Sequence, residues 1–495
     1  MNPPKFYDSH CHVMNLSHPN LLAFLQRLNV GWTLALAPLA PVISVFGKKK
    51  LNNLKNLLSV MENDLGTLFL MMEQFLIDDP TLWENGSLKI GGNLYSKIVF
   101  TPLLMDFGYK GRTDPGIYYN LPSQKPIVDQ VCDIFNGIRK YCEESEYQLF
   151  EIYPFLGLNT QNYFLADETS EIVSEKPNMM LLPETLRSKL KYNETYSKLI
   201  FFGEMSLDER NNLTGIFKNN PDKHAIRLIY DKSQKIAKRN TLQKMLDKYF
   251  SEYHSLQSEL SVKMGQFDGD IKKMDSNYFA GIKVYPPLGF DPWPEGDEEE
   301  LAKVKLLYQY CTDKKIPITS HCNSGGFVVV DRKTCEKYTS PERWAKVLEH
   351  YPNLRLNLAH FGKQDKKMVV VQPEEWTKQI IKLIGKYDHL YVDFSFNGLD
   401  EAYYKDLKRY IKNCPLDFRE KLKKRILFGS DFMINLTGAE SYNKYLQIYS
   451  ESPYFSAEEK NLFSSRNAER FVFGEARKME RMEDIDRLVA VMREG

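Results

Sequence analysis

Short apolar runs alternate with amphipathic segments over residues 279–475, and this alternation is the strongest constraint on the fold. The runs begin about 35 residues apart, the length of a strand–helix unit with its loops. Such alternation requires parallel strands that are covered by helices on the outside. The predicted strands are 281–286, 316–320, 354–359, 390–394 and 425–429, and the predicted helices are 299–314, 342–350, 374–387 and 403–411.

Apolar segments at 1–12, 96–107 and 147–158 supply further strands, and a (β/α)8 barrel is the best fit to the whole set. The chain has 495 residues, whereas a bare barrel needs about 250, so we expect large, mainly helical insertions. The predicted parts are a first barrel segment with helical insertions (1–160), an insertion lobe (161–278), a second barrel segment with most of the metal ligands (279–475) and a C-terminal helix (476–495).

Composition narrows the classes of function. The formal net charge is +1, from 66 basic and 65 acidic residues, so no global field attracts nucleic acid or an anionic membrane. The longest apolar stretch, Val30 to Phe46, contains two prolines and is short for a membrane span. Seven scattered cysteines without a Cys-x-x-Cys pair, and no secretory signal pattern, predict a reduced, cytoplasmic protein.

Histidines and a carboxylate recur at the ends of the predicted strands. Two of the histidines are separated by one residue, so their side chains point to the same side of a strand. In a barrel of parallel strands the C-terminal ends of all strands meet at one face, where the active site is built. This pattern predicts a metal site there. The residues are His10, His12, His321, His360 and Asp431.

Seven motifs, in this order, resemble the amidohydrolase superfamily, and more narrowly its amidohydrolase-2 branch, which includes aminocarboxymuconate-semialdehyde decarboxylase and related lactonases and hydrolases. The resemblance covers the N-terminus and the last part of the chain, and it leaves out residues 161–278. The motifs are DSHCH (8–12), GIKVYPPLGFDP (281–292), PITSHCNSGG (317–326), NLAHFG (357–362), YVDFS (391–395), ILFGSDF (426–432) and SRNAERFVFG (465–474).

The resemblance implies that His10, His12, His321 and Asp431 bind a single divalent metal ion, usually zinc. It also implies that His360 lies near the activated water, as an acid/base in single-metal members or as a ligand in two-metal members. The residue chemistry agrees, because three histidines and a carboxylate suit zinc, with manganese or iron as alternatives. A metal lowers the pKa of bound water, and Asp431 is placed to accept that proton and to deliver it to the leaving group.

Four other residues have two readings each. Lys283 is either a structural or substrate-binding ammonium or, as in two-metal members, a carboxylated bridge. Glu204 resembles a glutamate ligand of TatD-type hydrolases, or is a residue of the lobe. Asn323 begins a turn that either binds an anionic substrate group or is only a turn. Asp393 either orients a neighbouring histidine or is an ordinary residue at a strand end.

The sequence therefore predicts a metal-dependent hydrolase that uses a metal-activated water on an amide, cyclic amide or lactone bond. One alternative is a metal-dependent decarboxylase of a small unsaturated or aromatic acid, since the same branch contains both. The other is a regulatory or binding module that retains the metal site. We expect a small-molecule substrate and no nucleic-acid or membrane partner; a homodimer is an open alternative, because the branch commonly forms dimers.

Overall fold

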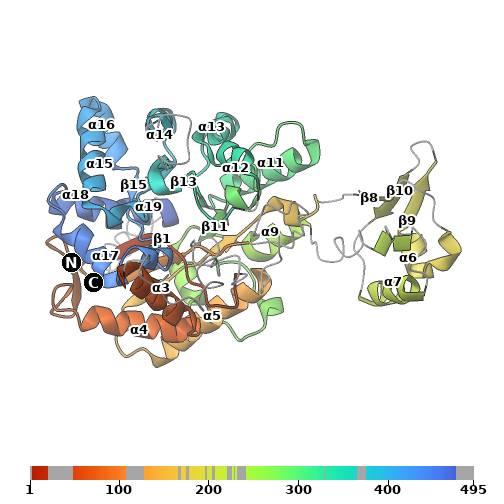
Figure 1. Ribbon diagram of the computed structural model, residues 1–495, viewed down its shortest axis with the longest axis horizontal. Coiled ribbons are helices and arrows are strands. Elements are labelled where there is room, and N and C mark those ends of the chain that lie inside the picture. Colours follow the sequence, from red (N-terminus) through yellow and green to blue (C-terminus); the bar gives the residue numbers. More distant parts are fainter. Residues whose placement is uncertain are drawn as a thin grey trace, which may run out of the picture. The chain divides into compact units, whose positions relative to one another are not determined.

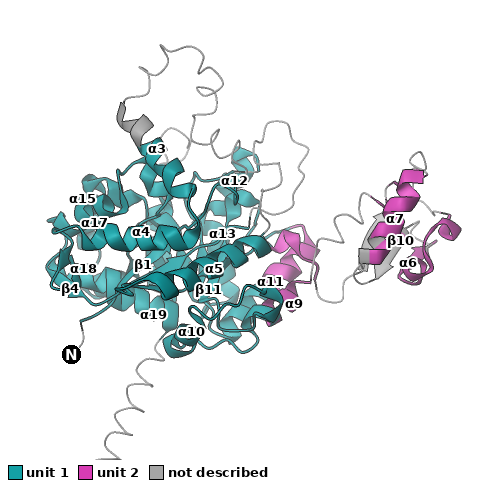
Figure 2. Ribbon diagram, turned by 90° about the horizontal axis from the view of Figure 1, so that it is seen from below, with its two compact units in different colours: residues 1–159, 248–295, 307–495 teal, residues 160–247, 296–306 magenta. Residues whose placement is uncertain are grey.

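The computed structural model divides into two compact units, shown in Figures 1 and 2. Unit 1 comprises residues 1–159, 248–295 and 307–495, and unit 2 comprises residues 160–247 and 296–306. The residues that the structure describes are 3–19, 48–106, 127–165, 169–173, 178–194, 198–202, 207–219, 226–227, 229–230, 241–328, 330–364 and 375–474.

A six-stranded parallel sheet forms one part of the core of unit 1, in the order β15-β14-β13-β12-β11-β7. Every residue of these strands is buried, as expected for a sheet that is covered on both faces. The parallel pairing predicted from the alternating pattern is confirmed. The strands are β7 (Phe155–Gly157), β11 (Gly281–Val284), β12 (Ile318–Ser320), β13 (Leu356–Leu358), β14 (Leu390–Asp393) and β15 (Ile426–Leu427).

A second parallel sheet has the order β1-β5-β6, with β1 (Phe6–Cys11), β5 (Ile98–Pro102) and β6 (Phe150–Ile152). Backbone contacts link both sides of this sheet to the first one. On one side, the Ser9 amide donates to the carbonyl of Phe428, the residue after β15, at 3.1 Å. On the other side, Leu103 forms a parallel bridge with Phe155 of β7.

Helices follow the strands in sequence and surround them in unit 1 (Figure 1). The four helices predicted between strands are confirmed to within two residues at each end, because their apolar faces recur at the helical period. Those four are α11 (Glu298–Asp313), α13 (Pro341–His350), α14 (Glu375–Lys386) and α15 (Glu401–Asn413). Unit 1 also contains α3 (Lys48–Met61), α4 (Leu65–Ile77), α5 (Ile127–Glu144), α10 (Gln257–Lys263), α12 (Arg332–Thr339), α16 (Leu416–Lys423), α17 (Tyr442–Glu451), α18 (Ala457–Asn461) and α19 (Asn467–Phe473).

A small antiparallel sheet lies in the long connection between β1 and β5. Its strands are β2 (Trp83–Glu84), β3 (Ser87–Ile90) and β4 (Asn93–Tyr95). The inner face of β3 buries Leu88 and Ile90, whereas Lys89 between them is exposed, so the period of two is clear.

Unit 2 contains an antiparallel sheet in the order β8-β10-β9. Its own core gathers apolar residues from the strands and helices, including Leu186, Leu199 and Leu213. The lobe predicted at 161–278 stays a prediction; residues 248–278 lie in unit 1. The elements are β8 (Thr169–Val173), β9 (Leu190–Asn193), β10 (Lys198–Phe202), α6 (Glu184–Ser188) and α7 (Leu207–Asn219), while α9 (Leu242–Phe250) and α11 contain residues of both units.

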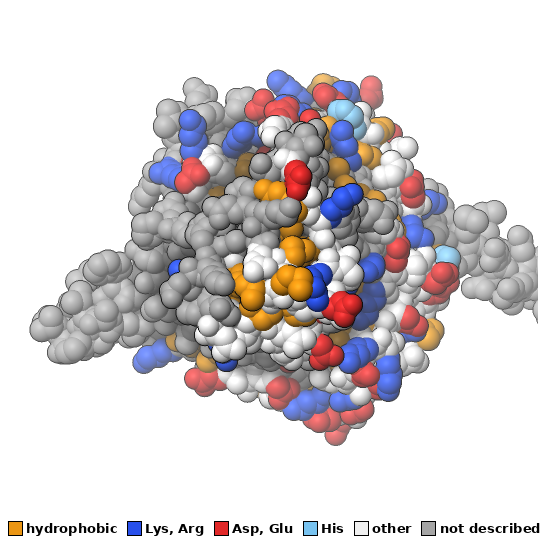
Figure 3. Space-filling view, turned by 90° about the vertical axis from the view of Figure 1, so that its right-hand side faces the viewer, with side chains coloured by type: hydrophobic (Ala, Val, Ile, Leu, Met, Phe, Trp, Pro, Cys, Tyr) orange, Lys and Arg blue, Asp and Glu red, His pale blue; other side chains and the backbone are white. Residues whose placement is uncertain are grey.

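Two predicted segments, Val30 to Phe46 and the C-terminal helix at 476–495, lie outside the described residues. Among the helices that the structure describes, none combines the length and apolar character that crossing a membrane requires. None of the seven cysteines, all of which lie within the described residues, forms a disulfide. On the face shown in Figure 3, hydrophobic side chains gather near the centre, and described side chains of both charges are interspersed around them.

Candidate metal centre

Strand β1 carries two of the predicted ligands into the interior. All six of its residues are buried, because β5 lies on one side and the segment after β15 on the other. His10 is 0% exposed and His12, just past the strand, is 3% exposed. The alternation of side chains along the strand brings the two imidazoles to the same side, with ring centroids 5.3 Å apart.

The hydrogen bonds of His10 define which ring nitrogen is free. Its Nδ1 lies 3.0 Å from Oδ2 of Asp393, whereas its Nε2 has no hydrogen-bond partner among the described residues. Burial lowers the pKa of His10, so the ring is neutral, Nδ1–H donates to the carboxylate and Nε2 carries the lone pair. A carboxylate behind a histidine in this way is typical of metal ligands.

Asp393, at the end of β14, is held in its ionised form. Burial by itself would raise its pKa, but the neighbouring His10, His360 and Ser395 hold that pKa well below its ordinary value. Asn357 donates to the same carboxylate at 2.7 Å. The structure thus confirms the reading in which Asp393 orients a histidine.

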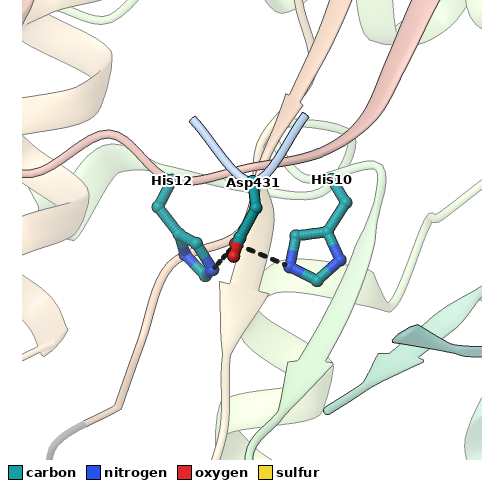
Figure 4. A group of neighbouring side chains, drawn as sticks. All are labelled: His10, His12 and Asp431. Carbon is teal, nitrogen blue, oxygen red and sulfur yellow. Dashed lines mark ion pairs between the residues drawn. The ribbon is translucent and has the colours of Figure 1, made fainter. Parts of the chain in front are cut away.

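His12 is oriented by a backbone carbonyl. Its Nδ1 lies 2.9 Å from the oxygen of Leu103, which can only accept, so Nδ1 carries the hydrogen. Burial lowers the pKa of His12 well below its ordinary value, and its Nε2 therefore presents a lone pair. That nitrogen lies 3.4 Å from Oδ1 of Asp431, as does Nε2 of His10 (Figure 4).

Asp431 completes this group of three from the loop after β15. Its backbone has φ 59°, a left-handed conformation that costs energy in most residues, and its amide donates to the His10 carbonyl at 2.7 Å. The three ligand atoms of His10, His12 and Asp431 lie within 4.8 Å of one another. Burial raises the pKa of Asp431 well above its ordinary value, so its ionised form needs positive charge nearby.

His321 and His360 form a second pair beside the group of three. His321 Nε2 donates to the Gly325 carbonyl at 3.0 Å, and His360 Nδ1 donates to the Ser395 carbonyl at 3.1 Å. Their other nitrogens face each other at 3.1 Å. Burial lowers the pKa of both rings, so two lone pairs meet there. The ring of His360 lies 4.9 Å from that of His10, and His321 pairs with His360 rather than with the group of three.

Lys283 of β11 lies close enough to the histidines for its charge to lower their pKa values. It is 1% exposed, and its Nζ lies 5.6 Å from the centre of the Tyr285 ring. Burial lowers the pKa of the ammonium to about 8, and the charges of Asp393 and Asp431 act against that shift. The Tyr285 ring in turn packs on His321 with centroids 4.6 Å apart.

Two further candidates are Asn323 and Glu204. The side chain of Asn323 accepts from the Gly325 amide at 2.8 Å, so it shapes the loop after β12, and a role in substrate binding stays a prediction. Glu204 lies outside the described residues. The metal-binding roles of His10, His12, His321 and Asp431, and the catalytic roles of Asp431 and His360, likewise stay predictions at this point.

Sequence reasoning missed two residues of the site. The hydroxyl of Ser395 lies 2.9 Å from His360 Nδ1, 3.1 Å from His10 Nδ1 and 2.5 Å from Oδ1 of Asp393, so it joins two histidines to one carboxylate. The sequence held one signal for Ser395: it follows Asp393 by two residues at the end of a predicted strand. Asp8 accepts from the Ser430 amide at 2.8 Å and from Tyr442 at 3.2 Å, and burial raises its pKa to about 7.

Gly326 allows the loop after β12 to approach the ring of His321. A Cβ at this position would lie 2.4 Å from the Tyr285 hydroxyl and 3.0 Å from His321 Nε2, and φ is 107°. We expect Gly326→Ala to displace one of these rings and to lower turnover about 100-fold, as a misplacement of about 1 Å can do. Steady-state kinetics check this, with Gly269→Ala as the control, because Gly269 has φ 93° and no atom within 4 Å. Equal losses in both variants would contradict it.

When the chain is compared with known protein families, one family model matches part of it. The family model described as amidohydrolase matches residues 267–474, and no curated protein matches the chain. Similar solved structures include a TIM-barrel protein of Bordetella bronchiseptica described as uncharacterised, which is 16% identical over 53% of this chain and 71% of that one, with a TM-score of 0.30.

Two other solved structures are similar at the same level. A probable 2-pyrone-4,6-dicarboxylic acid hydrolase of Acinetobacter baumannii is 9% identical over 96% of this chain and all of that one, with a TM-score of 0.39. An amidohydrolase of Burkholderia multivorans with bound zinc is 14% identical over 54% of this chain and 79% of that one, with a TM-score of 0.26.

Proposed function

We propose that this chain, whose residues 267–474 match the amidohydrolase family model, is a metal-dependent hydrolase that activates water for attack on an amide, cyclic amide or lactone bond. Its cofactor is one zinc ion per chain, held by His10, His12, Asp431 and His321. The substrate is a small molecule. A cytoplasmic location belongs to the same proposal.

One observation carries the proposal. The Leu103 carbonyl and the Asp393 carboxylate each take the hydrogen of one imidazole, which leaves Nε2 of His10 and His12 as acceptors. Both acceptors converge on the Asp431 carboxylate at 3.4 Å, so three electron-rich atoms face one point in a buried site. Without a cation this arrangement is repulsive unless Asp431 is protonated, and with one it is the nitrogen–oxygen donor set that zinc prefers.

His321 is included because its free nitrogen is also an acceptor. The Gly325 carbonyl fixes the hydrogen on Nε2, so Nδ1 is left to bind. It faces the lone pair of His360 at 3.1 Å, a contact between two acceptors that a cation or a proton would relieve. In the proposed metal-bound chain, His321 Nδ1 would exchange that unfavourable contact for the ion.

Each side chain of the site has its own role in the proposed reaction. A divalent cation supplies Lewis acidity, which lowers the pKa of water and polarises a carbonyl group. Asp431 accepts the proton of the attacking water and passes it to the leaving nitrogen or oxygen. His360, whose hydrogen is fixed on Nδ1, presents Nε2 as an acceptor that orients the water or, when protonated, as a donor to the carbonyl oxygen. Asp393 and Ser395 hold the two rings in these orientations.

We also propose that the two parallel sheets form a single eight-stranded barrel. Supporting this, β6 and β7 are separated by only two residues, so they count as one bent strand. The Leu103–Phe155 bridge continues the order on one side, and the Ser9–Phe428 and Asp431–His10 backbone hydrogen bonds continue it on the other. The candidate ligands then lie at the ends where strands of such barrels carry their active sites.

The deciding experiment is elemental analysis of the full chain, purified without chelator and again after reloading with zinc. We expect about one zinc ion per chain, as for a site with one set of ligands. The same samples are assayed with a panel of lactones under a pH indicator, since lactone hydrolysis releases a proton, and with cyclic amides by chromatography, since the carboxylate and ammonium formed there leave the pH nearly unchanged. A chain that binds no metal after reloading would contradict the proposal.

A further inference from the structure

Three helices of unit 1 supply most of the lining of a cavity of about 630 Å³. They are α3, α4 and α17, which lie side by side in both views (Figures 1 and 2). Cavities that bind small organic molecules have volumes of about 300–1,000 Å³, so this one has room for such a ligand. None of the candidate metal ligands lines it, so it is a site separate from the candidate metal centre.

The wall of this cavity is mainly apolar. Leu68 and Met72 of α4 line it and are buried, whereas Phe75, which follows Met72 by three residues, is 60% exposed. The buried side chains of Phe432 and Leu436 line it from the segment after Asp431. An aromatic ring that stays exposed beside a cavity is apolar surface that a ligand would remove from water. A flexible thioether such as that of Met72 adapts to the shape of an apolar ligand.

Two aromatic rings of the lining are held in place by the rest of the fold. The ring centroids of Phe432 and Tyr442 are 5.4 Å apart, and the Tyr442 hydroxyl donates to Asp8 at 3.2 Å. The Phe432 amide donates to the Ser430 hydroxyl at 2.9 Å. Because these contacts fix both rings, a ligand does not have to order them when it binds.

The charged side chains that line the cavity are all acidic. They are Asp78, Asp79 and Glu440, and no lysine or arginine lines it. Asp78 accepts from the neutral amide of Gln74 at 2.8 Å, and Asp79 from that of Asn443 at 3.0 Å. None of the three carboxylates forms an ion pair with a described residue. An apolar wall therefore lies beside negative charge that nothing in the described part of the chain neutralises.

We propose that this cavity binds a small organic cation, which has an apolar body and one ammonium or guanidinium group. The body packs against Met72 and Phe75, and the positive group lies toward Asp78 and Glu440. The three carboxylates repel an anion, and a neutral apolar molecule gains nothing from them. The volume suits a small molecule better than a helix of a protein partner, which needs an extended groove. This site goes beyond the proposed hydrolase function and does not depend on it.

The test compares two ligands that differ in one charge. 4-Phenylbutylammonium and 4-phenylbutan-1-ol share an apolar body, and the amine stays protonated at pH 7 as a lysine does. Their dissociation constants are measured by calorimetry on the zinc-loaded full chain.

The charge variant is Asp78→Asn with Glu440→Gln, because both side chains are exposed and their replacements keep the same shape. Asp79 is left unchanged, since it holds Asn443. The control is Asp313→Asn with Glu401→Gln, which removes two exposed carboxylates elsewhere. Asp313 accepts from a glutamine four residues before it at 2.8 Å, as Asp78 does.

A second pair of variants tests the apolar wall. Phe75→Ala removes the exposed ring and should weaken the binding of both ligands about fivefold, since the contact with the ring is lost. Leu416→Ala is the control, because Leu416 is 72% exposed and does not line the cavity. It should bind both ligands as the wild type does.

We expect the wild type and the charge control to bind the ammonium about fivefold more tightly than the alcohol, because exposed charge pairs each contribute modestly. In the charge variant the ratio falls to about one, with the affinity for the alcohol unchanged. No binding by the wild type, equal binding of the two ligands, or an unchanged ratio in the charge variant would overturn the inference. So would binding that appears only when a dimer is diluted, since it would assign the cavity to a second copy of the chain.

Discussion

Replacing His10 and His12 together with alanine should remove the proposed zinc ion and abolish the proposed hydrolysis, while the helices around the sheets stay folded. The two imidazoles supply two of the four proposed ligands, and no other described histidine or carboxylate belongs to their group of three. The remaining ligands then bind zinc too weakly to retain it during purification. Elemental analysis gives the zinc content, and far-ultraviolet circular dichroism with thermal unfolding reports the fold.

The control for this variant is the pair His254→Ala and His389→Ala, which removes two exposed histidines. It should keep both zinc and activity. Because two buried cavities could lower stability, His10→Gln with His12→Gln provides a second variant of nearly unchanged side-chain volume. Hydrolysis that survives in a folded, zinc-free variant would refute the proposed mechanism.

Substituting Asp431 with asparagine should give the second large effect. The amide keeps the size of the side chain but cannot take a proton from water or return it to the leaving group. General acid–base catalysis contributes a factor of about 10²–10⁴, and we expect a loss of turnover in that range at saturating zinc. Steady-state kinetics on a lactone that the wild-type chain hydrolyses provide the measurement.

Zinc content separates the two roles of Asp431. At saturating zinc the asparagine variant should still bind the ion through its histidines, so the loss appears in turnover and not in occupancy. Asp406→Asn on the exposed surface of α15 is the matched control, and it should match the wild type. A variant with full zinc and wild-type turnover would exclude Asp431 as the acid/base.

The elements that repeat in sequence could be predicted because short-range physics fixes them. The runs at 281–286 and 316–320 contain β11 and β12, since apolar residues bounded by turns and helices form buried strands. The spacing of His10 and His12 by two residues places them on one side of β1. The rule that strand ends meet at one face led from the sequence to Asp431, which lies beside them in the structure.

Other features depend on contacts between residues far apart in the chain. The Leu103 carbonyl and the Asp393 carboxylate determine which nitrogen of His12 and of His10 is free, and both partners are remote in sequence from the histidines that they orient. The sequence predicted which histidines belong to the site, but not which ring nitrogen of each histidine carries the hydrogen. The pairing of His321 with His360 has the same origin, because it depends on the turn at Ala359–Gly362, where His360 has φ 61°.

The sequence by itself determined the strand–helix order of residues 279–475 and the residue types of the candidate centre, because periodicity and ligand chemistry are local properties. Only the tertiary structure decided that Asp393 is the partner of His10, that Ser395 joins two rings and that Lys283 is left unpaired. Hydrogen-bond partners and desolvation depend on which strands become neighbours. The order of residues along the chain does not give the distances between side chains on different strands.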